Sequence, residues 1–229
     1  MSLLEFLTLH GLLYTETHIV YSSGKHGDTY ANLRPLGLPE HAESFREYSY
    51  SLLAKAIIEG ELNPAKPILV VGPETLGAKM AKTAVGEYNR RHNTQLQSAT
   101  FTATKHDDGS KTFSWSTDNW GINYIQSETQ IIWMDDLLNL SSTLARTRDI
   151  IEGLAKIFVV AVFFDRSHLT AVDLKVSHLV SLVKHQMPAH DEGRCPLCMD
   201  YVPIVTYLGH GKQFQDKHPE YPGGYKLST

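Results

Sequence analysis

Short, continuously apolar runs alternate with amphipathic stretches over most of the chain. Such runs suit strands buried on both faces of a parallel sheet, and they occupy residues 67–71, 130–134 and 157–164. Residues 78–91 and 142–156 each follow one of these runs and carry apolar positions at helical spacing. Strand–turn–helix units in this order predict an α/β fold, a parallel twisted sheet with helices on both faces. Ligands of such sheets bind outside the carboxyl ends of the strands, so we expect functional groups in the turns there.

The remaining segments are predicted to complete one domain over residues 1–229, because no Pro-, Gly- or Ser-rich linker separates two halves. We expect a short N-terminal helix capped by Ser2, a strand at 17–22, a helix over 40–59, a strand at 98–104 and a polar, aperiodic stretch at 105–118. Residues 185–229 are predicted to form an irregular C-terminal tail packed on this domain.

Composition narrows the class of protein. The chain has 229 residues, with 21 Lys or Arg against 25 Asp or Glu, so its formal net charge is −4 with histidine neutral. This balance argues against a nucleic-acid or anionic-membrane binder. The longest apolar run is far shorter than the ~20 residues of a membrane helix, and the N-terminus lacks the basic region of a secretory signal. Two cysteines cannot form a disulfide framework, so we expect a cytoplasmic protein.

The strongest local motif follows the apolar run 130–134. Asp135 and Asp136 end this predicted strand, and a short, hydroxyl-rich segment then opens a helix: Asn139, Leu140, Ser141, Ser142 and Thr143. The unpaired amides and positive dipole end of a helix N-terminus suit a phosphate monoester. The two carboxylates would lie beside the hydroxyls of a ribose attached to that phosphate. In the alternative interpretation, Ser141 only caps the helix and the aspartates are solvated.

A second candidate turn follows the run 67–71. Glycines at both ends, Gly72 and Gly77, permit unusual backbone angles. The exposed amides of the residues between them could line a diphosphate: Glu74, Thr75, Leu76 and Gly77. A plain strand-to-helix turn with Thr75 near the cap is the alternative.

Further motifs follow the same order as in a known family. An early substrate loop of that family is similar to Ser23-Gly24-Lys25 and Tyr30-Ala31-Asn32-Leu33. A late strand is followed by Asp165-Arg166, as in the family. The tail of some bacterial members is similar to Cys195-Pro196-Leu197-Cys198 with Val202-Pro203-Ile204. Together with the aspartate pair and the 72–77 turn, this series resembles the type I phosphoribosyltransferases, and among them the orotate phosphoribosyltransferases. The resemblance covers about residues 3–205.

The resemblance implies the type I phosphoribosyltransferase fold with a small hood, and a defined reaction. A nitrogen base displaces pyrophosphate from carbon 1 of phosphoribosyl pyrophosphate, with Mg²⁺ screening the diphosphate. It implies the following roles: Asp135 and Asp136 at the ribose; residues 139–143 at the 5′-phosphate; Glu74, Thr75, Leu76 and Gly77 at the pyrophosphate; Lys25, Asn32 and Arg166 at the base or diphosphate; Lys105 and His106 in a closing, catalytic loop. A homodimer is expected by the same analogy.

The sequence departs from this family's pattern near the predicted substrate. The 139–143 segment lacks the usual glycine, and Ser22 stands where a lysine is normal. Residues 102–111 contain Lys105, His106, Gly109 and Lys111 but no arginine, and a solvated hairpin tip is the alternative for this stretch. These departures predict weak or absent turnover of orotate. They leave open a non-catalytic protein, regulatory or ribose-phosphate-binding, that keeps the fold.

The C-terminal tail contains a candidate zinc site. His185, His190, Cys195 and Cys198 have a His-x4-His-x4-Cys-x2-Cys spacing that could hold a tetrahedral ion. The alternative is a metal-free turn, because a lone Cys-x-x-Cys is a weak signal. A zinc-stabilised interaction module with a vestigial pocket is accordingly a third functional hypothesis.

Overall fold

The fold is that of a computed structural model, which describes residues 1–63, 65–107, 111–116, 125–126, 128–139, 142–153 and 155–227. The chain divides into two compact units. The first unit joins Met1–Asn32 with Gln186–Thr229, and the second is Leu33–His185.

The second unit is built on a six-stranded sheet with the strand order β10-β9-β8-β5-β6-β7. Its strands are β5 (Ile68–Pro73), β6 (Gln97–Lys105), β7 (Lys111–Trp115), β8 (Gln130–Leu138), β9 (Ile157–Asp165) and β10 (His178–Lys184). All neighbours pair in parallel except β6 and β7, which are antiparallel. The predicted parallel α/β sheet is therefore confirmed, and β8 lies in its interior.

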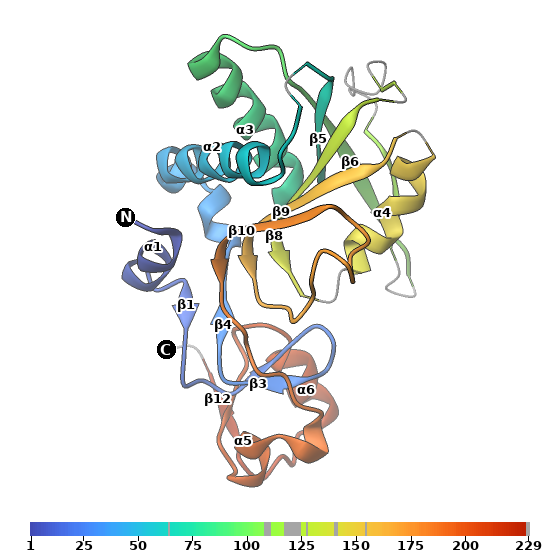
Figure 1. Ribbon diagram of the computed structural model, residues 1–229. Helices are drawn as coiled ribbons and strands as arrows, with labels where there is room; N and C mark the ends of the chain where they lie inside the picture. Colours follow the sequence, from blue (N-terminus) through green and yellow to red (C-terminus); the bar gives the residue numbers. More distant parts are fainter. Residues whose placement is uncertain are drawn as a thin grey trace. The chain divides into compact units, whose positions relative to one another are not determined.

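Helices cover both faces of this sheet (Figure 1). They are α2 (Ala42–Glu59), preceded by the short 3₁₀ turns η1 (Arg34–Gly37) and η2 (Pro39–His41), α3 (Leu76–His92) and α4 (Ser142–Glu152). Successive side chains of a strand point to opposite faces, and β9 shows this directly. Val162 packs in one core cluster with Leu144 of α4, whereas the next residue, Phe163, meets Phe45 of α2 edge to face, at 6.0 Å between ring centroids.

Three segments of the second unit differ from the sequence prediction, and one of them, strand β10, was not predicted at all. Strand β8 does not end at Met134 but continues to Leu138, because β9 is long enough to pair with it through Leu138 and Asp165. The stretch 105–118 was expected to be aperiodic, yet β7 pairs antiparallel with β6. Trp115 supplies the reason, since its ring stacks on Phe101 of β6 at 4.1 Å.

The first unit combines the two ends of the chain. Its elements are α1 (Leu3–Leu9), β1 (Leu13–Tyr14), β2 (Ile19–Val20), β3 (His26–Gly27), β4 (Tyr30–Ala31), η4 (Glu192–Arg194), α5 (Pro196–Met199), β11 (Ile204–Val205), α6 (Gly211–Lys217) and β12 (Tyr225–Lys226). Ser2 caps α1 as predicted, in a capping box with Glu5. Val20 packs against Ile204 and Phe214, so the start and the tail of the chain share one small core.

None of the helices in the described parts of the chain combines the length and hydropathy that a bilayer span requires.

Candidate active site

The aspartate pair lies near the carboxyl end of β8. Asp135 is in register with Val162 of β9, so it belongs to the paired part of the strand. Asp135 and Asp136 are half-buried residues, and the backbone amide of Asp136 donates a hydrogen bond to Asp135 Oδ1 at 2.9 Å. The backbone thus fixes two adjacent carboxylates at the edge of the sheet where ligands of α/β folds bind.

The electrostatics of this pair indicate an uncompensated negative charge. Burial raises the pKa of Asp135 well above its usual range, and the negative charge of Asp136 raises it further. Burial also raises the pKa of Asp136, against the hydrogen bond from Asp135 and the positive charge of Arg34. A cation or a set of hydroxyl donors would therefore be stabilised beside these two carboxyls.

The β5–α3 turn lies directly against the aspartates. A Cβ atom added to Gly77 would be 2.8 Å from Asp135 Oδ1 and 2.9 Å from the carbonyl oxygen of Met134. A Cβ added to Gly72 would be only 2.1 Å from the carbonyl oxygen of Gly77. Both glycines are therefore required by close backbone approach rather than by flexibility. The structure brings together two motifs that are about sixty residues apart in the sequence.

The rest of this turn is anchored on β6. The amide of Glu74 donates to the carbonyl of Phe101 at 2.9 Å, and its Oε2 accepts from the amide of Ala103 at 2.9 Å. The carboxylate of Glu74 thus positions the turn and, being negative, is unsuited to contact a diphosphate itself. Thr75 is exposed and immediately precedes α3, and the Glu74–Thr75 peptide bond is cis.

Two cations near this edge were not identified from the sequence. Arg34 lies in η1, and its charge acts on Asp136. Lys79 lies in the first turn of α3, where its Nζ donates to the carbonyl of Gly37 and lies 5.3 Å from the centre of the Phe45 ring. The position of Arg34, directly after the Tyr30–Leu33 motif, was the one sequence signal that could have identified it. No motif in the sequence indicated Lys79.

The predicted phosphate segment is split between β8 and α4. Asn139 follows β8 directly, while Ser142 and Thr143 form the first turn of α4. Leu140 and Ser141 lie outside the described residues.

Helix α4 is fixed to β8 by a buried hydrogen bond. Trp133 Nε1 donates to Thr147 Oγ1 at 3.2 Å, and Thr147 Oγ1 in turn donates to the carbonyl of Thr143 at 3.0 Å. Leu144 is also buried against the sheet. These contacts hold the first turn of α4 in place relative to the strand that carries the aspartates.

Arg166 follows β9 at the same edge of the sheet. Its amide donates to the carbonyl of Leu138 at 3.1 Å, next to the end of β8, and its side chain is nearly buried. Asp165 has a structural role, because its Oδ1 accepts from the amide and hydroxyl of Ser167 at 2.9 and 2.7 Å. Its Oδ2 lies 3.8 Å from Lys184 Nζ.

The predicted closing loop is an extension of the β6–β7 hairpin. Lys105 ends β6 opposite Lys111, and His106 Nε2 lies 3.0 Å from Thr112 Oγ1. Both Lys105 and His106 are exposed, and Gly109 lies outside the described residues. Their proposed role in closure remains a prediction.

Lys25, Asn32 and Ser22 belong to the first unit. Lys25 Nζ lies 3.5 Å from Asp191 Oδ1, and the amide of Asn32 donates to the carbonyl of Leu12 at 2.8 Å. Ser22 is exposed. The roles of Lys25 and Asn32 toward a substrate also remain predictions.

The metal-ligand prediction requires a correction. Cys195 and Cys198 do lie together, but their partners are His18 and His26. Neither predicted histidine belongs to this group of side chains. The amide of His185 donates to the carbonyl of Asp165 at 2.9 Å in the second unit, and His190 exchanges two backbone hydrogen bonds of 2.8 Å with His26. The His-x4-His-x4-Cys-x2-Cys spacing therefore does not correspond to one cluster in the structure, because tertiary folding brings His18 and His26 to the cysteines from the N-terminal segment.

A cavity of about 540 Å³ lies at the opposite ends of the strands, lined by Ile68, Leu69 and Gln97 among others. These residues begin β5 and β6. The cavity is therefore separate from the aspartate edge of the sheet.

Comparison with known proteins supports the fold assignment. No protein-family model matches the chain, and no curated protein matches it. Among solved structures, the orotate phosphoribosyltransferase of Francisella tularensis is similar with a TM-score of 0.54 and 14% identity, over 93% of this chain and 97% of that one. The orotate phosphoribosyltransferase of Aeropyrum pernix is similar with a TM-score of 0.53 and 15% identity, over 79% and 92%.

The UMP synthase of Leishmania donovani is similar with a TM-score of 0.53 and 14% identity over 79% of this chain. The matched region spans only 34% of that larger protein. At these identities the likeness concerns the fold. The chain has the type I phosphoribosyltransferase fold in the form found in orotate phosphoribosyltransferases, which confirms the resemblance of fold predicted from the sequence.

Proposed function

We propose that this protein is a phosphoribosyltransferase of the orotate type, which transfers the phosphoribosyl group of phosphoribosyl pyrophosphate to a nitrogen base. One observation supports this most directly. Asp135 and Asp136 lie near the carboxyl end of an interior parallel strand, with Gly77 of the β5–α3 turn against the Asp135 carboxylate. A ribose and a diphosphate are adjacent in the substrate, and the groups suited to each are adjacent here.

Catalysis of this reaction requires the protein to position the two substrates and to stabilise the charges that develop. Asp135 and Asp136 would accept hydrogen bonds from the ribose hydroxyls and offset the positive charge that develops on the ring as pyrophosphate departs. Ser142 and Thr143, with Asn139, would bind the 5′-phosphate. Backbone amides of residues 75–77 would bind the diphosphate, helped by the N-terminal end of α3.

The carboxylate oxygens of Asp135 and Asp136 are suitable ligands for Mg²⁺. This ion prefers oxygen ligands and usually binds through one or two carboxylates together with substrate phosphates. Burial in the first place, and the charge of Asp136 in the second, raise the pKa of Asp135, and a cation beside this carboxyl would favour its ionised form. When bound, Mg²⁺ would screen the negative charge of the diphosphate. Asp135 and Asp136 are the residues that we propose to hold it, directly or through water.

We further propose that orotate itself is a poor acceptor. Ser22 replaces a lysine and the 102–111 segment lacks an arginine, so two cationic groups of the family pattern are missing. A hydrogen bond to a charged group contributes about 1.5–3 kcal/mol. Two such losses would lower turnover by roughly two to four orders of magnitude unless other cations compensate. Lys25, Lys105 and Arg166 are the candidates for such compensation at the base or diphosphate.

A second candidate function is non-catalytic binding of a ribose phosphate, in a protein that keeps the fold for regulation. The sequence of the phosphate segment favours it, because residues 139–143 contain no glycine and so restrict close approach of the backbone to phosphate. In either case we expect, by analogy, a homodimer, which light scattering at micromolar concentration would test. A cytoplasmic location remains part of the proposal and rests on the two cysteines.

Pyrophosphate release tests the proposal. The protein is incubated with phosphoribosyl pyrophosphate, Mg²⁺ and a panel of pyrimidine and purine bases, and binding of phosphoribosyl pyrophosphate is measured by calorimetry. We expect binding, weak or absent release with orotate, and faster release with another base. Binding without release for any base would instead favour the non-catalytic candidate. Absence of both binding and release would contradict both functions.

A further inference from the structure

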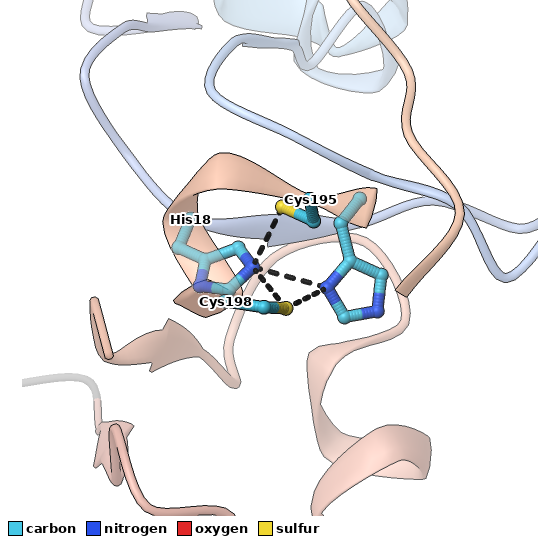
Figure 2. Close-up of side chains that lie close together, drawn as sticks. His18, Cys195 and Cys198 are labelled. Atoms are coloured by element: carbon cyan, nitrogen blue, oxygen red, sulfur yellow. Dashed lines mark hydrogen bonds between the residues drawn. The ribbon is translucent and has the colours of Figure 1, made fainter. Parts of the chain in front are cut away.

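Four side chains of the first unit converge on one point. His18 directly precedes β2 and His26 begins β3, whereas Cys195 directly precedes α5 and Cys198 lies in it. One ligand atom from each of the four residues lies within 4.8 Å of all the others. Figure 2 shows the side chains of His18, Cys195 and Cys198 pointing toward one another.

The distances match those around a tetrahedral ion. His18 Nε2 lies 3.0 Å from His26 Nδ1, 3.8 Å from Cys195 Sγ and 3.6 Å from Cys198 Sγ, and Cys198 Sγ lies 3.2 Å from His26 Nδ1. Zinc bonds of about 2.0–2.1 Å to nitrogen and about 2.3 Å to sulfur place tetrahedral ligand atoms about 3.3–3.8 Å apart. These four distances differ from the tetrahedral values by at most a few tenths of an ångström, and the two remaining pairs of ligand atoms lie within 4.8 Å.

The orientation of both imidazole rings is fixed from outside the cluster. His18 Nδ1 lies 2.7 Å from the carbonyl oxygen of Val202, an acceptor, so this nitrogen carries the proton and donates. The lone pair of Nε2 then points into the cluster, which is the arrangement of a metal-bound histidine with its supporting partner. The ring of His26 lies edge to face against Phe214, with 4.9 Å between centroids, and its backbone pairs with His190.

Burial distinguishes this cluster from a chance group of polar side chains. His18 is 1% exposed, His26 0% and Cys195 0%. Histidine and cysteine side chains withdrawn from water without full pairing are costly. Two thiolates, two neutral imidazoles and one divalent cation have no net charge, so an ion would remove this cost.

We propose that His18 Nε2, His26 Nδ1, Cys195 Sγ and Cys198 Sγ bind one Zn²⁺. Two sulfur and two nitrogen ligands in tetrahedral geometry are typical of zinc, and four protein ligands leave no open position for substrate, so the site is structural. Its ligands come from the two ends of the chain. The three histidine–cysteine pairs with distances of 3.2–3.8 Å are separated by 172 to 180 residues in the sequence. The ion joins the N-terminal segment to the tail and thereby closes the first unit.

Metal content of the full-length protein tests this site. The protein is produced without a histidine tag in zinc-supplemented medium, purified under reducing conditions and analysed by plasma mass spectrometry. We expect about one zinc per chain, and tetrahedral cobalt bands in the visible region with thiolate-to-cobalt charge transfer after exchange with Co²⁺. Reduced, folded protein that neither contains zinc nor takes up Co²⁺ would overturn the proposal, as would a Cys195–Cys198 disulfide or iron in place of zinc.

Variants identify the ligands. His26→Asn and Cys198→Ser should each lose most of the zinc, whereas His185→Asn and His190→Asn, the matched controls, should retain it. If the two ligand variants do not fold, the zinc content of the two control variants and the cobalt spectrum of the wild-type protein still decide the assignment. Loss of zinc in His185→Asn or His190→Asn, with zinc retained in His26→Asn, would contradict the proposed ligand set.

Discussion

The aspartate pair of the second unit and the histidine–cysteine cluster of the first unit are built in opposite ways. Asp135 and Asp136 are adjacent in sequence and lie on one strand, so their position depends on the register of β8 alone. The cluster instead needs residues from both ends of the chain to meet. A contiguous site can be recognised from the sequence as a motif, whereas only half of a distributed site leaves a local signal, here the Cys-x-x-Cys.

The two sites also share an electrostatic feature. In each site, groups that can ligate a cation are withdrawn from water: burial raises the pKa of both aspartates in spite of the charge of Arg34, and three of the four cluster residues are buried. We propose Mg²⁺ with a substrate diphosphate for the first site and Zn²⁺ for the second. Because their ligand sets differ, oxygen against nitrogen and sulfur, each site can be removed without the other. The following predictions use this independence, from the largest expected effect to the smallest.

Removing both carboxylates should separate the two sites most clearly. We expect Asp135→Asn/Asp136→Asn to lower turnover, or binding of phosphoribosyl pyrophosphate, by about two to four orders of magnitude, because two charge-assisted contacts are lost. Zinc content should remain at the wild-type value. Asp149→Asn, which neutralises an exposed carboxylate of α4, is the control and should behave as wild type. A double variant that binds phosphoribosyl pyrophosphate as tightly as wild type would disprove the assignment of the aspartate pair.

Removing zinc should have the next largest effect, and only on the first unit. Chelation leaves three buried ligands and the half-buried Cys198 without their ion, so the small core around Val20, Ile204 and Phe214 should open. Limited proteolysis followed by mass spectrometry would then detect new cleavage within residues 1–32 and 186–229, while 33–185 stays protected. Adding Zn²⁺ back should restore protection. Equal cleavage of both units after chelation would show that the ion stabilises more than the first unit.

The contact between Gly77 and the aspartates can be tested against another glycine of the same helix. Gly77→Ala would place a Cβ against the carbonyl oxygen of Met134 and the Asp135 carboxylate, which should cost about 1–3 kcal/mol and displace the pair. Gly86→Ala meets nothing within 4 Å on α3 and should stabilise the protein by up to about 1 kcal/mol through helix propensity. Denaturant unfolding measures both. Equal effects of the two substitutions would remove the argument for close packing at Gly77.

Sequence reasoning predicted best those elements whose apolar pattern is continuous. Residues 68–73, 130–138 and 157–165 form buried strands because both their faces are covered, and that burial requires an unbroken apolar run. Strand β7 lacked this signal. It lies at the edge of the sheet, and only Phe113 and Trp115 are apolar in it. Strand β10, at the other edge, was also not predicted, and its apolar run is interrupted by Ser181.

The candidate active site was predicted in its residues but not in its geometry. Asp135 and Asp136 were identified from their place after an apolar run, yet β8 carries them within its paired region because β9 extends beside it. The approach of Gly77 to Asp135 depends on how α3 starts over β5, a tertiary feature that spacing does not encode. For the same reason the histidines nearest to the cysteines in sequence were chosen in place of His18 and His26.

The smallest expected effect concerns the stability of the Asp135→Asn variant. This substitution should lower activity but raise the melting temperature at neutral pH. Because the folded state raises the pKa of Asp135, this carboxyl favours folding while it is protonated, and that contribution is lost as the pH rises through its folded pKa. Asp135→Asn keeps the neutral form at every pH. We therefore expect its melting temperature, in buffer without divalent cations, to equal that of wild type below about pH 4, the usual range of an unfolded aspartate. The variant should then become the more stable of the two toward pH 7.

The difference in melting temperature should be about 2–4 °C for each ~1 kcal/mol of relieved repulsion and desolvation in a chain of this length. Asp149→Asn, whose carboxylate is exposed, should show no such pH-dependent gain. Mg²⁺ together with phosphoribosyl pyrophosphate should stabilise the wild-type protein and narrow the gap, since ligand binding to the folded state adds stability. An Asp135→Asn variant that is less stable than wild type at pH 7 would show that the carboxylate supports the fold, and that the negative charge there is already compensated.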